Sequence, residues 1–198
     1  GGNINLSVNG STINADNFKD LDGQTAGGAV FHVPSGGDGN DAGILVIHGT
    51  AITEFSIGGQ ELWIDRICLL EHQPGDPNQP GDPNRPPADC VEFEELTLAS
   101  VYNVGDLFSV SNTDGSLKLE AQVLGFENAD GSTTTTGSAT VENGGNAGAM
   151  GHELNLNNVL VQFKPASPNP PGLSLHFGEY GGNINLSVNG STINADNF

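Results

Sequence analysis

Positive charge is scarce in this 198-residue chain, which has 5 Lys and Arg residues against 24 Asp and Glu residues and a formal net charge of −19 at pH 7. A surface this acidic repels nucleic acid and anionic lipid, so neither is expected as a partner. No apolar run approaches the roughly 20 residues of a membrane helix, and no signal peptide is recognisable. Methionine occurs once, which indicates a processed or excised piece of a longer reading frame.

Catalytic signatures are missing as well. The histidines show no HExxH spacing, and the chain has no GxSxG motif and no Walker-type loop with its lysine. No pair of carboxylates stands out as the acid and base of a glycosidase. We therefore expect a protein that is not an enzyme.

Helix signals are also few, and the chain is dominated by short stretches of β-branched and aromatic residues. Turn residues bound each stretch, a pattern typical of a β-sandwich or barrel. We expect an all-β protein, an antiparallel β-sandwich of the jelly-roll type, with a single loose helical turn at 15–21. The predicted strands are 4–8, 28–33, 43–48, 51–57, 61–70, 90–98, 117–126, 138–142, 153–163 and 173–177.

The segment 71–89 interrupts this pattern with the repeated unit GDPNQP and GDPNRP. Proline withholds its backbone N–H, and Gly-Asp-Pro-Asn favours turns, so this segment cannot form a helix or join a sheet. It is either a semi-rigid linker between domains or a long Pro/Gly-rich loop. A second loose segment, 130–137, is expected to be an exposed loop tip.

The chain contains two cysteines, at the end of one predicted strand and the start of the next. Antiparallel pairing with Cys68 opposite Cys90 gives an apolar pair and an opposite-charge pair, as a cross-strand register should. The pairs are Val91 with Ile67, Glu92 with Arg66, Phe93 with Asp65 and Glu94 with Ile64. A Cys68–Cys90 disulfide would stabilise the fold by roughly 3 kcal/mol and indicates an oxidising, extracellular setting. Buried free thiols are the alternative.

The most informative feature is a duplication, because residues 1–18 and 181–198 are identical letter for letter. A segment that recurs after 180 residues indicates a tandem array of repeats. A single core should offer one groove for the apolar face of this segment, so the other copy is left to join a neighbour's sheet. Alternatively, one copy is disordered or a cloning remnant. The strand-donation residues are Ile4, Leu6, Val8, Ile184, Leu186 and Val188.

Read from Cys90 through the second copy, and then from residue 19 to Cys68, the sequence resembles the jelly-roll repeats of secreted bacterial surface proteins. It is similar in plan to galactose-binding-like and carbohydrate-binding modules, with Phe93-Glu94 in the first strand and Trp63-Ile64-Asp65 in the last. The resemblance implies a permuted domain. Residues 1–70 are its C-terminal half, 71–89 the linker, and 90–198 its N-terminal half with the duplicated strand segment 181–198.

The resemblance also implies a structural Ca²⁺ between the first and last strands, held by Asp65, Glu92 and Glu94. The alternative is that Glu92 pairs with Arg66 while the other two carboxylates face water. Ca²⁺ is the one cofactor considered. Tyr102 and Tyr180 are the candidate ligand-binding aromatics, whereas a core role is favoured for Trp63.

Glycan attachment is a further hypothesis. Asn5 and Asn9 stand in Asn-X-Ser sequons, and four threonines could carry O-linked sugar, namely Thr133, Thr134, Thr135 and Thr136. Ordinary strand and turn roles are the alternative. Taken together, the sequence predicts a structural subunit of an extracellular fibre or cell-surface array whose partners are copies of itself. The alternative function is a Ca²⁺-dependent carbohydrate-binding or adhesin module with glycans as partners.

Overall fold

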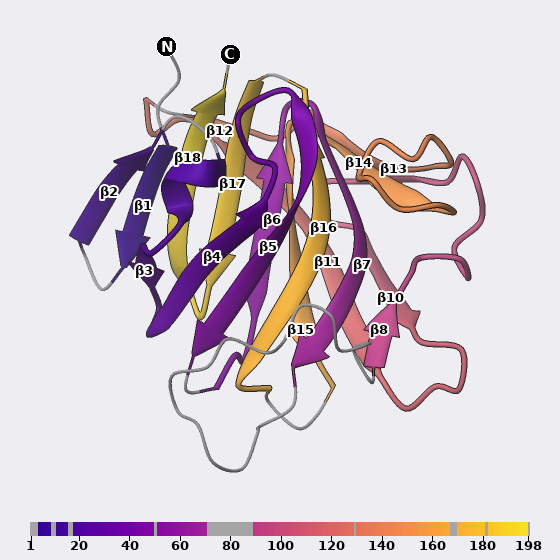
Figure 1. Ribbon diagram of the computed structural model, residues 1–198. Helices are drawn as coiled ribbons and strands as arrows, with labels where there is room; N and C mark the ends of the chain where they lie inside the picture. Colours follow the sequence, from indigo (N-terminus) through magenta and orange to yellow (C-terminus); the bar gives the residue numbers. More distant parts are fainter. Residues whose placement is uncertain are drawn as a thin grey trace, which may run out of the picture.

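The computed structural model describes residues 4–8, 11–15, 18–49, 51–70, 89–128, 130–166, 170–180 and 182–197. These ranges form two antiparallel sheets packed face to face as a β-sandwich (Figure 1), which confirms the predicted all-β sandwich class. Within them, no helix has the length and apolar character needed to cross a membrane. The segment 71–88, which contains most of the predicted linker, lies outside the described residues.

The first sheet runs in the order β10-β11-β15-β6-β17-β18-β1-β2, and β12 attaches to β11. Its strands are β10 Leu107–Ser111, β11 Lys118–Glu127, β15 Val159–Pro165, β6 Phe55–Gly59, β17 Gly182–Val188, β18 Ser191–Asn197, β1 Ile4–Val8, β2 Ser11–Ala15 and β12 Thr133–Thr134. Strand β2 therefore ends the sheet on the side of the two chain termini.

The second sheet runs in the order β3-β4-β5-β16-β7-β14-β13-β9, and β8 attaches to β7. Its strands are β3 Thr25–Ala26, β4 Ala29–Ser35, β5 Asp41–Gly49, β16 Gly172–Glu179, β7 Leu62–Leu70, β14 Glu153–Asn157, β13 Ser138–Glu142, β9 Val101–Asn103 and β8 Asp89–Val91. Segments 1–70 and 90–198 thus contribute strands to both sheets.

The core lies between the sheets and follows from the alternation of side chains along each strand. In β5, for example, Leu45 and Ile47 are fully buried, while Ile44, Val46 and His48 on either side of them are only half-buried. The 3-10 helix η1 (Phe18–Leu21) closes one end, where the ring of Phe18 stacks on that of Phe177 with centroids 4.1 Å apart. The helical turn expected at 15–21 is therefore present as this single turn.

The disulfide predicted between Cys68 and Cys90 is present, with Cα atoms 4.0 Å apart. The two cysteines lie directly opposite each other in the β7–β8 pair, and Ile67 lies opposite Val91, as the register argument predicts. The bond joins two positions of the same chain. It also closes the loop that contains the Pro/Gly-rich segment, which limits the conformations of the unfolded chain.

The same register fails beyond Val91, where β8 ends. Phe93 adopts a left-handed backbone with φ 55°, and the adjoining edge of β7 is occupied by β14, which pairs Leu154 with Ile64. The predicted strand 90–98 is therefore wrong after its first residues, because another strand takes the edge that it would need.

A second difference concerns the predicted strand 153–163, which is two strands in two sheets. Asn158 has φ 53°, and this left-handed residue turns the chain from β14 in the second sheet to β15 in the first. A continuous apolar pattern cannot reveal such a change of sheet, because both strands bury residues in the same core.

Candidate functional site: the seat of the duplicated hairpin

Both copies of the duplicated segment form the same hairpin, and both hairpins belong to the first sheet. The second copy forms β17 and β18, and the first copy forms β1 and β2 (Figure 1). Strand β17 pairs with β6, whereas β1 pairs with the far edge of β18. The two identical sequences therefore occupy different positions in one sheet.

The position beside β6 is part of the core. Strand β17 places Leu186 opposite Ile57 and Val188 opposite Phe55. Leu186 and Val188 are 1% and 0% exposed, and burying two aliphatic side chains of this size stabilises a fold by about 3–6 kcal/mol together. The second copy therefore fills the groove that the sequence predicted. The side chains of Ile4, Leu6, Val8 and Ile184 lie outside the described part of the structure.

The first copy differs from the sequence expectation in one respect. The sequence predicts that the other copy joins a neighbour's sheet, but β1 pairs with β18 of the same chain and β2 becomes the last strand of the sheet. The surplus hairpin is thus an addition to the sheet margin, two strands removed from β6. Its placement is possible because β18 offers a strand edge that β17 leaves unused.

The turn of the second hairpin is a two-residue turn at Asn189 and Gly190. Their φ angles are 48° and 80°, and two left-handed residues in succession are the mark of the type I′ turn that Asn-Gly favours. The sequence predicts this turn at the identical pair Asn9-Gly10, which lies outside the described residues. The identical pair in the second copy, Asn189-Gly190, forms this turn.

Asn189 joins the hairpin turn to the body of the protein through five side-chain hydrogen bonds. Its Oδ1 accepts from the backbone N and Oγ1 of Thr53, both at 2.8 Å, and from the backbone N of Glu54 at 3.3 Å. Its Nδ2 donates to the carbonyl oxygens of Ala51 at 3.0 Å and Gly27 at 3.3 Å. The backbone N of Asn189 donates to the Glu54 carbonyl at 2.9 Å. We name this set of partners, residues 27, 51, 53 and 54, the turn socket.

Sequence reasoning missed the turn socket. The Asn-Gly pair signals a turn, but nothing in its letters shows that the asparagine amide serves a tertiary contact 135 or more residues away. The available signal was the isolated Gly27-Gly28 pair, which marks a place where another backbone approaches closely.

Gly27 forms the wall of the turn socket, with φ 56°, and a Cβ there would overlap the carbonyl oxygen of Val188. Gly28 also has a positive φ, of 79°, but a Cβ there meets no atom within 4 Å. We expect Gly27→Ala to lower the free energy of unfolding by about 2 kcal/mol more than Gly28→Ala, because both carry backbone strain but only one displaces the hairpin. Urea unfolding followed by the fluorescence of Trp63 measures both, and equal losses would contradict the close contact.

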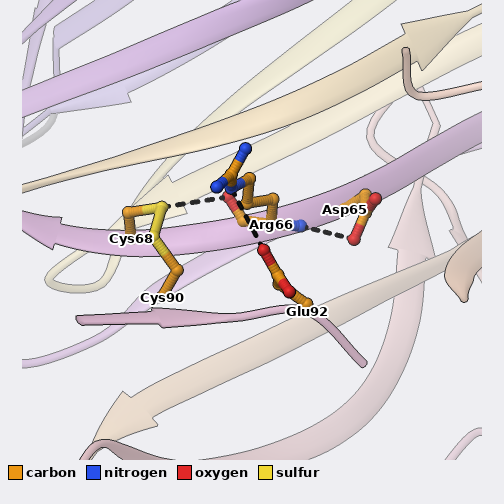
Figure 2. The surroundings of a disulfide bond; sticks show 5 residues. All are labelled: Asp65, Arg66, Cys68, Cys90 and Glu92. Atoms are coloured by element: carbon orange, nitrogen blue, oxygen red, sulfur yellow. Dashed lines mark hydrogen bonds and ion pairs between the residues drawn. A yellow bond between two sulfur atoms is a disulfide. The ribbon is translucent and has the colours of Figure 1, made fainter. Parts of the chain in front are cut away.

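Two of the three residues considered for Ca²⁺ contact Arg66, as Figure 2 shows, and the third contacts His152. Glu92 forms an ion pair with Arg66, Oε1 to Nε 3.3 Å, and Oδ1 of Asp65 accepts from the backbone N of Arg66 at 2.6 Å. Glu94 accepts from the backbone N of His152 at 2.8 Å. Among the described residues, no group of three or more carboxylate, imidazole or thiol side chains is placed to hold a metal ion.

Asp65 is only 3% exposed, so it does not face water as the alternative supposed. Burial raises the pKa of Asp65 to about 7, the N–H of Arg66 acts in the opposite direction, and the nearby charges of Glu153, Glu92 and Glu94 raise the pKa further. Glu153 is buried too, but its carboxylate accepts backbone hydrogen bonds from Gly144, Asn146 and Ala147 at 2.9–3.1 Å. The two buried carboxyls therefore differ: Asp65 accepts one backbone hydrogen bond and is penalised by burial, whereas Glu153 accepts several.

A third buried carboxyl lies at the base of the hairpins. Glu179 is fully buried, and within the described ranges neither of its side-chain oxygens has a hydrogen-bond partner. Burial raises the pKa of Glu179 to about 7, the negative charge of Asp41 adds to the effect, and the backbone of Gly39 and of Phe18 opposes it. Asp41 lies directly opposite Glu179 in the β5–β16 pair.

The position of Glu179 connects it to both copies of the duplicated segment. Strand β16 ends at Glu179 and β17 begins at Gly182, while Phe18 is the first residue of η1 after β2. The buried carboxyl therefore lies where the chain enters the second hairpin and where it leaves the first. Sequence analysis did not select Glu179, because a glutamate at the end of an apolar strand is indistinguishable from an exposed strand-end residue.

The candidate ligand-binding aromatics do not share one surface. Tyr102 lies opposite Ala139, in the same cross-strand row as the buried Leu62, and its ring stacks on that of Phe108 with centroids 4.3 Å apart. Trp63 occupies the neighbouring row, whose side chains point to the other face of the sheet. Tyr180 lies beside Trp63, with ring centroids 5.4 Å apart. The structure thus joins Tyr180 to Trp63 and separates both from Tyr102.

The glycosylation hypotheses fall on different kinds of position. Asn9 lies outside the described residues, as does the side chain of Asn5. Asn189, the counterpart of Asn9, donates both Nδ2 hydrogen bonds of the turn socket, and a glycan on this nitrogen would remove at least one of these N–H donors. Thr133 and Thr134 form the short strand β12, and Thr135 and Thr136 follow it. Thr134 is half-buried, whereas the other three are exposed.

No protein-family model, curated protein or solved structure gives a significant match to the chain.

Proposed function

We propose that this chain is a structural subunit of an extracellular fibre or cell-surface array, a tandem jelly-roll repeat that assembles by donating a terminal β-hairpin to a neighbouring copy. The observation that carries the proposal is the unequal placement of two identical hairpins. The second is buried beside β6 and bonded through the turn socket, whereas the first adds to the sheet margin. The first hairpin, β1–β2, is therefore the donor.

The disulfide supports a role outside the cell, and the net charge and the strand edges bear on how copies assemble. The chain carries one disulfide and no free cysteine, which suits an oxidising compartment. Its net charge of −19 keeps copies apart in solution except where a specific contact overcomes the repulsion. Backbone pairing along a strand edge is such a contact, because it needs no complementary charges. A head-to-tail contact of this kind that does not close produces a filament.

The alternative, a Ca²⁺-dependent carbohydrate-binding or adhesin module, has less support. The carboxylates of Asp65 and Glu92 bind the backbone N and the guanidinium of Arg66, and that of Glu94 binds the backbone N of His152. Tyr102 and Tyr180 lie on different faces of the second sheet, so they cannot form one platform for a sugar. The Trp63–Tyr180 pair is the feature that such a module would use.

Two deletions that remove the same hairpin sequence test the proposal. We expect the chain without residues 1–17 to fold but to run as a monomer in size-exclusion chromatography and to form no filaments in negative-stain micrographs. The chain without residues 181–198 should lose cooperative unfolding, because it loses Leu186 and Val188 from the core. The full chain should assemble. A full chain that stays monomeric at high concentration, or filaments of the 1–17 deletion, would contradict the donor role.

A further inference from the structure

Strand β18 lies between two copies of the same strand. On its inner edge, β17 places Leu186 opposite Ile193 and Asn185 opposite Asn194. On its outer edge, β1 places Leu6 opposite Ile193 and Asn5 opposite Asn194. Since 5 and 185 are the same position of the duplicated segment, both edges of β18 bind an identical strand in an identical alignment.

The third contact in this part of the sheet repeats the alignment again. Strand β1 pairs with β2 so that Leu6 lies opposite Ile13 and Asn5 opposite Asn14, and 13 and 14 are the counterparts of 193 and 194. One register therefore describes every contact between these strands, whether or not a turn joins them. Strands β1 and β18 pair although no turn joins them, so this register does not depend on a hairpin connection.

The connection between the first hairpin and the body is short. Only residues 16 and 17 separate β2 from Phe18, which is fully buried and stacked on Phe177. Everything from Phe18 onward can keep its place if the hairpin changes partner. A short link between an element and its domain favours the exchange of that element between identical chains. The strand pairing that the hairpin makes on another copy replaces the same pairing on its own chain, so protein concentration controls the balance.

We propose that the outer edge of β18 is the acceptor site for assembly, and that the strand it receives is β1 of a second copy, aligned with Leu6 opposite Ile193. This assignment rests on the proposed function and specifies its partner surface. Each copy gives one hairpin and receives one. Because the giving and receiving surfaces differ, the exchange continues from copy to copy as an open chain when the rotation between copies does not close into a ring.

Two single-cysteine variants test the acceptor site, because positions 5 and 194 lie directly opposite each other and opposed strand positions are within disulfide reach. Asn5→Cys and Asn194→Cys are purified separately, mixed at a concentration where the full chain assembles, and oxidised with the native Cys68–Cys90 bond kept intact. Neither variant can form a 5–194 bond within one molecule. A parallel mixture of Asn5→Cys with Asn14→Cys probes the edge of β2 instead. Non-reducing electrophoresis and disulfide mapping identify the bonds formed.

The expected result is a covalent heterodimer joined through positions 5 and 194, at a yield at least several-fold above any joined through positions 5 and 14. A heterodimer formed mainly through 5 and 14 would overturn the assignment, because the donated hairpin would then extend β2. No heterodimer in either mixture would overturn it too. Micrographs of the same samples distinguish failure of the acceptor site from failure of the proposed function. Filaments without a 5–194 bond refute the acceptor site alone, whereas a lack of any assembly refutes the proposed function.

Discussion

Replacing Asn189 by alanine is expected to lower the free energy of unfolding by about 3 kcal/mol, the sum of several partly solvated hydrogen bonds and a strained backbone. The change removes the five side-chain bonds of the turn socket. It also places alanine at φ 48°, a conformation that asparagine tolerates better. The groups that bind Asn189, such as the carbonyl of Ala51, would then have to form hydrogen bonds with water.

The chain contains its own control for this change, because Asn9 is the same residue of the same hairpin. We expect Asn9→Ala to cost less than half as much, since the first hairpin pairs with β18 and the turn socket already holds Asn189. Urea unfolding of both variants, followed through the single tryptophan, compares them directly. Equal losses would show that the two hairpins exchange freely between the two positions, and a larger loss at Asn9 would reverse the assignment of donor and core hairpin.

Acidity is expected to stabilise the protein, with the free energy of unfolding falling as pH rises from about 4.5 towards 7. Burial raises the pKa of both Glu179 and Asp65 to about 7 in the folded state, above their unfolded values of 4.5 and 3.8. In this interval the folded chain holds protons that the unfolded chain has released, so each unit of pH removes stability. Above pH 7 both states are ionised at these groups and the slope ends.

Glu179→Gln should remove the contribution of one group, stabilising the protein by about 2 kcal/mol at pH 8 and reducing the slope between pH 4.5 and 7. Glutamine keeps the shape but carries no charge against Asp41. The matched control is Glu153→Gln, also at a buried glutamate, which should destabilise because one glutamine oxygen cannot accept all the bonds that the carboxylate accepts. Urea unfolding at several pH values measures both. A stability that rises with pH in the wild type, or a loss in Glu179→Gln at pH 8, would contradict the buried charge.

Much of the fold could be predicted from local pattern. Alternating apolar residues placed most of the strands, and the match of Val91 with Ile67 identified the disulfide register. Pattern failed where another part of the chain competes for the same edge, as β14 does beside Ile64. It failed again at Asn158, where one apolar run changes sheet.

The candidate site was predictable only in part. The duplication and its apolar positions are visible in the letters, and so is the expectation of a single groove. The sequence cannot show which copy occupies that groove, because residues 1–18 and 181–198 are identical. Asn189 and Glu179 were missed because their roles depend on residues far away in the chain, at 27, 41 and 51–54.

The amino-acid sequence by itself predicted that this protein is a two-layer β-structure with a disulfide between two neighbouring strands, and it showed that one hairpin sequence occurs twice. Those properties depend on side-chain periodicity and identity, which are local. Only the tertiary structure decided which copy enters the core. Strand β16 delivers the second copy directly to the free edge of β6, whereas the first copy leads into η1 and pairs with the edge that remains. Chain connection therefore gives two identical segments different energies and different roles.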